Sequence, residues 1–241
     1  MARVCTLVLL KGQKLCDDFG RGNPRVKNFI DSAFSREHII PPAELERKIA
    51  GLQDHRRPLE VVYFGRLTAY KGIDRSLEAI ARVVGSHGPV LRFHVIGTGE
   101  EEEFLRALVD RLGIVSQVVF HGAIPFGRRL FDRLYRCDLL LATPLSEDTP
   151  RNALDAMASG VPILAFDTYY YQDLQRSEAV DVVPWLSIEA LAERLVQYAA
   201  HKPSLEASIR NGVLFAQDNT QDIWLRRRYE WTLEAIGAAQ P

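Results

Sequence analysis

The sequence predicts an α/β protein built on a doubly wound parallel sheet. Short, continuously apolar runs alternate with segments in which apolar residues recur at three- and four-residue spacing, a pattern typical of buried strands alternating with amphipathic helices. Glycines close the first two runs, with Gly65 ending residues 59–65 and Gly97 following residues 90–96. Strands that are apolar throughout belong to parallel sheets covered on both faces. These observations favour a Rossmann-like domain, whose ligands bind beyond the carboxyl ends of the strands.

The elements follow in a regular order. Between and after the strands, apolar spacing predicts helices, and Pro203 separates two of the later ones. The predicted strands cover residues 59–65, 90–96, 118–120, 138–142, 161–166 and 180–183. The predicted helices cover residues 77–84, 104–112, 126–136, 151–159, 188–200, 204–216 and 223–236, with a helical turn over 169–175.

The segment before the sheet has a different pattern. Residues 4–10 form one strand-like run, Gly- and Pro-bearing loops follow around residues 20–24, and a short helix is predicted over 44–50. This stretch is too small for a complete domain. We therefore predict three parts, which are a small N-terminal segment (1–58), a sheet domain (59–202) and C-terminal helices (203–241).

Composition restricts the function classes. The 241 residues carry 30 Lys and Arg against 31 Asp and Glu, a net charge of −1 that argues against a general nucleic-acid binder. Cys5, Cys16 and Cys137 are too few and too widely spaced for a disulfide framework or a zinc site, so we expect reduced thiols and a cytoplasmic protein. No apolar run approaches the length of a transmembrane helix.

Several cofactor motifs are absent from the sequence. Gly97-Thr98-Gly99 resembles the start of a dinucleotide fingerprint, but the third glycine position holds Glu102 inside an acidic run that would repel a pyrophosphate. The sequence contains no phosphate-binding Gly-x4-Gly-Lys-Ser/Thr loop and no Asp-x-Asp metal motif, and its His and Cys residues lack ligand spacing. We therefore expect neither a metal nor an organic cofactor.

Two cations follow the first strand. Arg66 lies directly after Gly65, and Lys71 begins the next helical segment, so both belong to the ligand side of the sheet. An arginine fork and a lysine point charge together suit a diphosphate. The alternative is an ordinary solvated loop.

Two acids surround a later helix start. Thr149 is predicted as the N-cap and Pro150 as the first helical residue, so Glu147 would precede the helix while Asp155 would lie roughly 7–8 Å along its axis. Free N–H groups between them would attract an anion. A nucleotide-sugar, hydroxylated at both ends and charged in the middle, has this shape. The alternative is a pair of capping carboxylates on a surface helix.

Together these residues resemble the nucleotide-sugar-binding half of family-4 (group 1) glycosyltransferases, which have the two-domain GT-B fold. The Glu-x7-Glu signature of that family is present as Glu147-x7-Asp155. The matching stretches are residues 62–67, 71–74, 93–100, 119–122, 137–141 and 147–162. The resemblance covers about residues 60–183, half of the chain.

The resemblance implies roles for individual residues. Arg66, Lys71 and Glu147 would be catalytic, the two cations neutralising the donor diphosphate and Glu147 holding hydroxyls of the donor sugar. Asp155 would hold the ribose hydroxyls, although it is one methylene shorter than the usual glutamate. The family transfers sugars with retention of configuration and usually without a metal ion. The other implied donor-binding positions are Gly65, Gly97, Ala123, Ile124, Asp148 and Thr149.

Residues 1–58 resemble only the last strand and linker of the family's acceptor-binding N-terminal domain. The N-terminal glycine loop and the catalytic histidine have no counterpart. We therefore predict a retaining transferase that uses a UDP- or GDP-sugar, in surface polysaccharide or glycoconjugate synthesis. The alternative is a nucleotide-sugar-binding module, or one subunit of a split enzyme, without turnover of its own. Predicted partners are a chain carrying the acceptor domain or a second copy, with peripheral contact to a membrane and none to nucleic acid.

Overall fold

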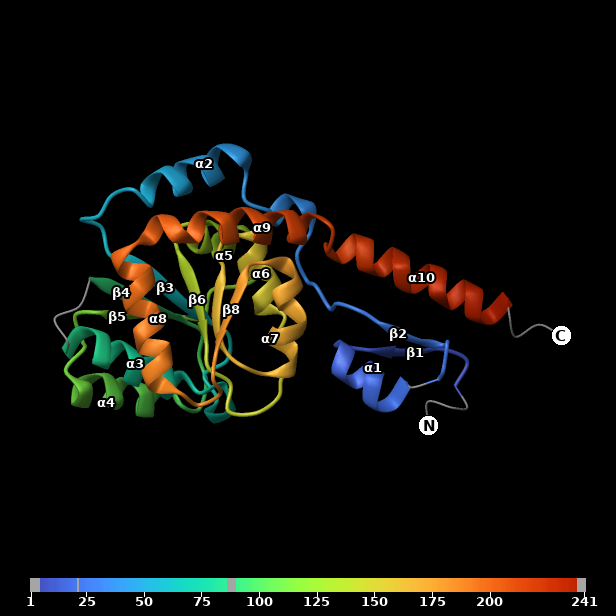
Figure 1. Cartoon of the computed structure of the whole chain (residues 1–241), viewed down its shortest axis with the longest axis horizontal. Helices are drawn as coiled ribbons and strands as arrows, with labels where there is room; N and C mark the ends of the chain where they lie inside the picture. Colours follow the sequence, from blue (N-terminus) through green and yellow to red (C-terminus); the bar gives the residue numbers. More distant parts are fainter. Residues whose placement is uncertain (1–4, 21, 86–89, 238–241) are drawn as a thin grey trace.

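The computed structural model describes residues 5–20, 22–85 and 90–237. Within them, six parallel strands form one sheet in the order β5-β4-β3-β6-β7-β8, with helices on both faces (Figure 1). This confirms the predicted doubly wound α/β fold. The strands are β3 (Leu59–Phe64), β4 (Leu91–Ile96), β5 (Val118–Gly122), β6 (Leu139–Ala142), β7 (Ile163–Phe166) and β8 (Val180–Val183).

The strand order reverses between β3 and β6, which lie side by side although β4 and β5 separate them in sequence. In open parallel sheets, the crevice at such a reversal, outside the carboxyl ends of the strands, is where ligands bind. The loops that follow β3 and β6 carry Arg66, Lys71 and Glu147. The topology therefore brings these predicted residues to one edge of the sheet.

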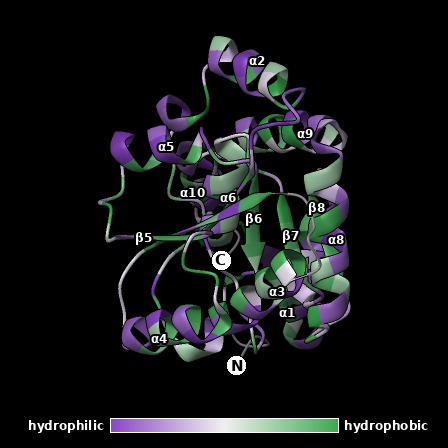
Figure 2. Ribbon diagram, turned by 90° about the vertical axis from the view of Figure 1, so that its left-hand side faces the viewer, coloured by the Kyte–Doolittle hydropathy of each residue, from purple (hydrophilic) through white to green (hydrophobic). Residues whose placement is uncertain are grey.

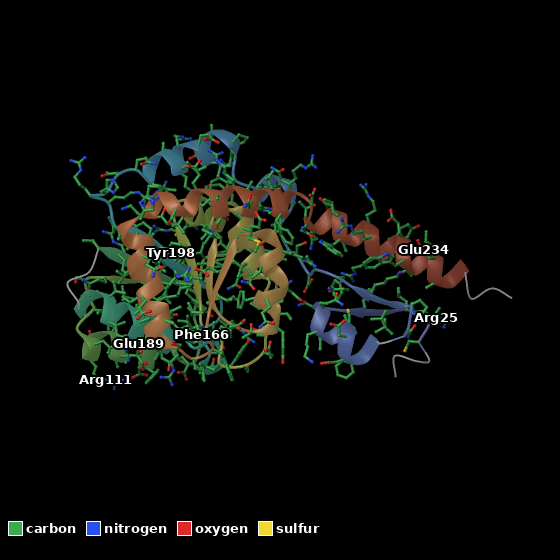
Figure 3. All side chains as sticks on the ribbon, in the orientation of Figure 1. Arg25, Arg111, Phe166, Glu189, Tyr198 and Glu234 are labelled. Carbon is green, nitrogen blue, oxygen red and sulfur yellow. The ribbon has the colours of Figure 1, made fainter. Side chains whose placement is uncertain are left out.

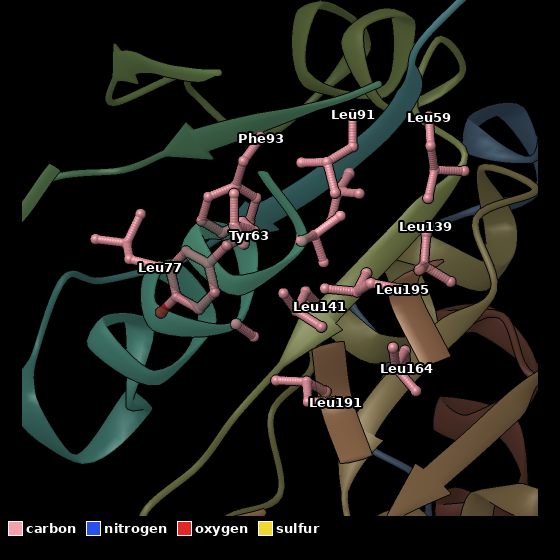
Figure 4. Close-up of a cluster of buried hydrophobic side chains, with 14 of the residues drawn as sticks. Leu59, Tyr63, Leu77, Leu91, Phe93, Leu139, Leu141, Leu164, Leu191 and Leu195 are labelled. Carbon is pink, nitrogen blue, oxygen red and sulfur yellow. The ribbon is translucent and has the colours of Figure 1, made fainter. Parts of the chain in front are cut away.

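Successive strand residues point to opposite faces, and each face has its own core. Val61 packs with the cluster beneath α3 (Ile73–Gly85), α4 (Glu102–Leu112) and α8 (Ile188–Ala200), part of which Figure 4 shows. Val62 packs with the cluster beneath α5 (Arg128–Leu134), α6 (Asn152–Ala158) and α7 (Tyr169–Leu174). In Figure 2, β6 and β7 are hydrophobic, as strands buried on both faces must be.

A small N-terminal unit lies apart from this sheet and consists of β1 (Val8–Leu10), α1 (Gln13–Gly20) and β2 (Val26–Asn28). β1 pairs with β2 in parallel. The strand predicted over residues 4–10 is observed only as β1, and Val4 lies outside the described residues. The sequence analysis missed α1 and β2 because each is short and rich in polar residues.

The linker to the sheet domain is fixed by polar contacts. Its helix α2 (Pro42–Gly51) includes the helix predicted over residues 44–50. The Lys48 ammonium donates to the Ser159 carbonyl at 3.2 Å. Arg57 donates two hydrogen bonds to the buried Asp138 carboxylate, at 2.6 and 2.9 Å. Removing one partner of such a buried pair costs about 3–5 kcal/mol, so this pair holds the linker on the domain.

The last two helices of the described residues are α9 (Glu206–Gln217), which packs on α6, and α10 (Gln221–Gly237). Figure 1 shows α10 extending from the sheet domain past the N-terminal unit, and Figure 3 shows Arg25 and Glu234 on these two parts, away from Phe166 in the sheet domain. Lys27 and Trp231 link them, with the ammonium 6.0 Å from the indole ring centre. The opposite face of α10 carries exposed apolar side chains, namely Leu225, Tyr229, Leu233 and Ile236.

Candidate functional site

Two neighbouring cavities lie at the carboxyl edge of the sheet. The first, of about 450 Å³, lies among the loops after β3, β4 and β5 and the start of α6. The second, of about 420 Å³, lies between the N-terminal unit and the loop before α6. The first cavity is lined by the predicted residues Gly65, Arg66, Lys71, Gly97, Ala123, Ile124 and Asp155. The second is lined by the predicted residues Glu147, Asp148 and Thr149.

The floor of the first cavity is backbone held at a fixed position. Gly97 has φ +136°, and a Cβ there would lie 1.8 Å from the Gly65 carbonyl oxygen, so only glycine fits this approach of two loops. The Tyr63 hydroxyl donates to the Arg66 carbonyl at 2.7 Å. These contacts fix the Arg66 main chain, while its exposed guanidinium has no ion pair or hydrogen bond among the described residues.

Lys71 lies between the two cavities. It lines the first, and its ammonium is paired with the Asp148 carboxylate, which lines the second. The following Gly72 has φ +64°, and a Cβ there would lie 1.9 Å from the Thr143 carbonyl oxygen. The Thr143 hydroxyl also donates to the Gly72 carbonyl at 2.7 Å. The end of β6 therefore positions Lys71 at the junction of the cavities.

The helix near these acids begins later than predicted. The residue before α6 is Arg151, which makes no side-chain capping bond, so Thr149 is not the N-cap and Pro150 is not the first helical residue. One local bond and one tertiary contact hold this loop. The Thr149 N–H donates to the carboxylate of the adjacent Asp148 at 2.8 Å, and the Lys11 ammonium lies 3.5 Å from the Thr149 carbonyl oxygen.

Asp155 is buried in α6, with 5% of its surface exposed. Burial raises the pKa of this carboxyl to about 7, against the weaker opposing effect of Arg151. Its Oδ1 atom has no hydrogen-bond partner among the described residues. A capping carboxylate on a surface helix would be solvated, so this burial argues against that alternative for Asp155. The first cavity therefore contains an acceptor that the described part of the chain leaves unpaired.

Glu147 is exposed at the second cavity and accepts a hydrogen bond from the Tyr169 N–H at 3.3 Å. The predicted helix start had suggested that Glu147 and Asp155 face one site. The structure instead places Glu147 in the second cavity and Asp155 in the first. The N-terminal unit supplies the opposite wall through Lys11, Gly12 and Lys14. The sequence analysis missed these residues. A signal for them was a glycine near the end of a strand, since Gly12 lies two residues after β1, much as Gly65 and Gly97 follow β3 and β4.

Asn152 was also missed. Its Nδ2 donates to the Phe64 carbonyl at 2.6 Å, and the residue lines the first cavity. No group of three His, Cys, Asp or Glu side chains in residues 5–20, 22–85 and 90–237 is arranged to hold a metal ion. No helix in the same residues is long and apolar enough to cross a membrane.

Comparison with known proteins identifies relatives. The chain is 28% identical over 193 residues to the lipopolysaccharide glucosyltransferase WaaG of Escherichia coli, covering 78% of this chain and 49% of that one. It is 29% identical over 127 residues to the 2-deoxystreptamine glucosyltransferase of Streptomyces kanamyceticus, covering 52% of this chain and 32% of that one. The matches thus span a third to a half of these relatives.

Solved structures share the fold. Anabaena Alr3699/HepE, solved in complex with UDP, superposes with a TM-score of 0.78 at 18% identity, covering 97% of this chain and 65% of that chain. WaaG, described as a glycosyltransferase involved in lipopolysaccharide biosynthesis, superposes with a TM-score of 0.71 at 22% identity. The superposition covers 93% of this chain and 61% of that chain. A family model described as glycosyl transferases group 1 matches residues 46–214. The chain therefore belongs to the group 1 glycosyltransferase family.

Proposed function

We propose that this chain binds a nucleotide-sugar donor across the two cavities and serves a retaining glycosyltransferase. The observation that carries the proposal is the position of Lys71 between a cavity that contains Asp155 and one that contains Glu147. A donor placed along this line has its ribose near Asp155, its diphosphate at Lys71 and Arg66, and its sugar near Glu147. The crystal structures of Alr3699/HepE in complex with UDP and with UDP-glucose support a donor of this class.

The chemistry follows from this placement. The bond between the anomeric carbon and the diphosphate oxygen breaks, and its electron pair leaves with the nucleoside diphosphate. Arg66 and Lys71 stabilise the negative charge that develops there. The acceptor hydroxyl oxygen forms the new bond. With retention the acceptor attacks from the face that the diphosphate leaves, so the departing phosphate oxygen is positioned to take the hydroxyl proton. The donor is a substrate, and we propose that no metal or other cofactor is needed.

The relatives suggest where such a transferase acts. Those with named roles include WaaG, a lipopolysaccharide glucosyltransferase, and WcaL, described as a putative colanic acid biosynthesis glycosyltransferase. We propose surface polysaccharide or glycoconjugate synthesis in the cytoplasm, where the free thiols of Cys5, Cys16 and Cys137 would stay reduced.

A second candidate function is donor binding without turnover by this chain alone. The exposed apolar face of α10 favours it, because Leu225, Tyr229, Leu233 and Ile236 are 50–64% exposed and recur at helical spacing. A continuous apolar stripe of this kind marks a surface for a partner. We propose that an acceptor-binding domain, on another chain or in a second copy, covers it.

A panel of nucleotides tests the proposed function. The chain is mixed with UDP, GDP or ADP, each with and without a chelator, and its unfolding temperature is measured. At least one nucleoside diphosphate should stabilise it equally in both conditions, by an amount that grows with ligand concentration. No shift with any of them, for a chain that unfolds cooperatively, would contradict the donor site.

A further inference from the structure

Two side chains on one turn of α6 leave buried oxygens unpaired. Asn152 and Asp155 are three residues apart in the helix, so they lie on the same face, and both line the first cavity. The Oδ1 atoms of both are buried, and neither has a hydrogen-bond partner among the described residues. An unpaired buried acceptor costs about 1–3 kcal/mol, so a ligand that donates hydrogen bonds to these two oxygens would gain affinity from both.

The orientation of the Asn152 amide is fixed by its other hydrogen bond. Its Nδ2 lies 2.6 Å from the Phe64 carbonyl oxygen, which can only accept. An amide turned the other way would place two acceptors against each other, so the nitrogen must face Phe64. The Oδ1 atom is therefore the free acceptor.

Asn219 shows how the same arrangement is completed elsewhere in the chain. Asn219 is a buried residue, and its Nδ2 donates to the Phe215 carbonyl at 2.7 Å. Its Oδ1 accepts from the Trp224 indole N–H at 2.9 Å. At Asn152 the described residues supply the first of these bonds and not the second. Because Asn152 lines the first cavity, a ligand bound there would be the source of the second bond.

We infer that Asn152 binds the ligand, forming with Asp155 a pair of acceptors for the two hydroxyls of a ribose. This rests on the proposed nucleotide site and names a residue that selects ribonucleotides within it. A vicinal diol offers two O–H donors on adjacent carbons, which matches two acceptors one helical turn apart. Asp155 is one methylene shorter than a glutamate, and Asn152 supplies the second acceptor for the diol.

The test compares UDP with 2′-deoxy-UDP and 3′-deoxy-UDP by titration calorimetry on the whole chain. We expect the wild type to bind UDP more tightly than either deoxy form. In Asn152→Ala this preference should fall about tenfold, which corresponds to about 1.4 kcal/mol. Asn152→Ser is the second variant. It removes the amide oxygen together with the amide bond to the Phe64 carbonyl and leaves a small polar side chain in their place. It should lose the preference to the same extent as Asn152→Ala.

Asn219→Ser is the matched control. It removes the same kind of amide-to-carbonyl bond far from the cavity, so it should lower the unfolding temperature and leave the ribose preference unchanged. If UDP binds and neither Asn152 variant changes the preference, the assignment of Asn152 is wrong and the nucleotide site stands. If no nucleotide binds to the folded wild type, the proposed function itself is wrong.

Discussion

Lys71 and Asp148 form an ion pair at the junction of the two cavities, although 77 positions separate them in sequence. Their side chains are 17% and 25% exposed, so water screens the pair only in part. A diphosphate that binds to Lys71 must compete with this carboxylate. We therefore propose that Asp148, predicted as a donor-binding residue, competes with the diphosphate for Lys71.

Asp148→Asn should strengthen binding of UDP. The substitution removes a negative charge beside the diphosphate and frees the Lys71 ammonium. An effect of about 1–2 kcal/mol, or roughly fivefold to thirtyfold in affinity, is expected for a partly buried charge. Uridine, which lacks phosphates, should bind as before. Titration calorimetry with both ligands measures the difference, and a weaker affinity for UDP would show that Asp148 positions Lys71 for binding.

Lys71→Ala should weaken the binding of UDP by about 1.5–3 kcal/mol, because the lost contact is a charge-assisted bond to phosphate. The affinity for uridine should not change. Added salt should likewise lower the affinity for UDP and leave that for uridine unchanged. The double variant Lys71→Ala, Asp148→Asn completes a mutant cycle that separates the lost contact from the unpaired Asp148 charge. Equal losses for UDP and uridine would indicate that Lys71 only maintains the fold.

Asp155 should make the ligand-free chain less stable as pH rises. Its pKa is about 7 when folded against 3.8 for the free side chain, so the folded state binds more protons between these values. The contribution of Asp155 to the free energy of unfolding is therefore most favourable below about pH 4. It falls by up to about 3–4 kcal/mol by pH 7. Asp155→Asn should remove this loss and raise the unfolding temperature at pH 7.5 by about 5 °C or more.

The comparison must be between wild type and variant at each pH. Burial, with Arg133 nearby, lowers the pKa of His121 to about 4, so protonation of His121 destabilises the fold as pH falls from 6.5 towards 4. This effect opposes that of Asp155 over nearly the same pH range. It is the same in the wild type and in Asp155→Asn, so it cancels when the two are compared. A difference between them that does not grow from pH 4 to pH 7 would contradict the ionisation of a buried Asp155.

The sheet was predictable because its strands are short, mostly apolar runs, and Gly65 and Gly97 directly follow two of them. The candidate residues followed from a motif read along the chain. The contacts that set their environment could not be predicted, since Asn152 and its partner Phe64 are 88 positions apart. The N-cap predicted at Thr149 was wrong for the same reason, because the Lys11 ammonium contacts the Thr149 carbonyl oxygen from 138 positions away.

The apolar face of α10 should make the isolated chain associate. We expect light scattering at high concentration to report a dimer or larger species. The double variant Leu225→Ser, Leu233→Ser should shift it towards the monomer without changing UDP affinity, because both side chains are about half exposed and lie outside the cavities. A wild-type chain that stays monomeric would contradict the role of this face.

The position of the diphosphate is the central claim, and a crystal structure of the chain with UDP measures it directly. We expect phosphate oxygens within hydrogen-bond distance of Lys71 and Arg66, with Lys71 released from Asp148. The ribose should lie against Asp155 in the first cavity, and the terminal phosphate should face Glu147. A nucleotide bound elsewhere, or phosphates remote from a Lys71 that is still paired with Asp148, would contradict the account.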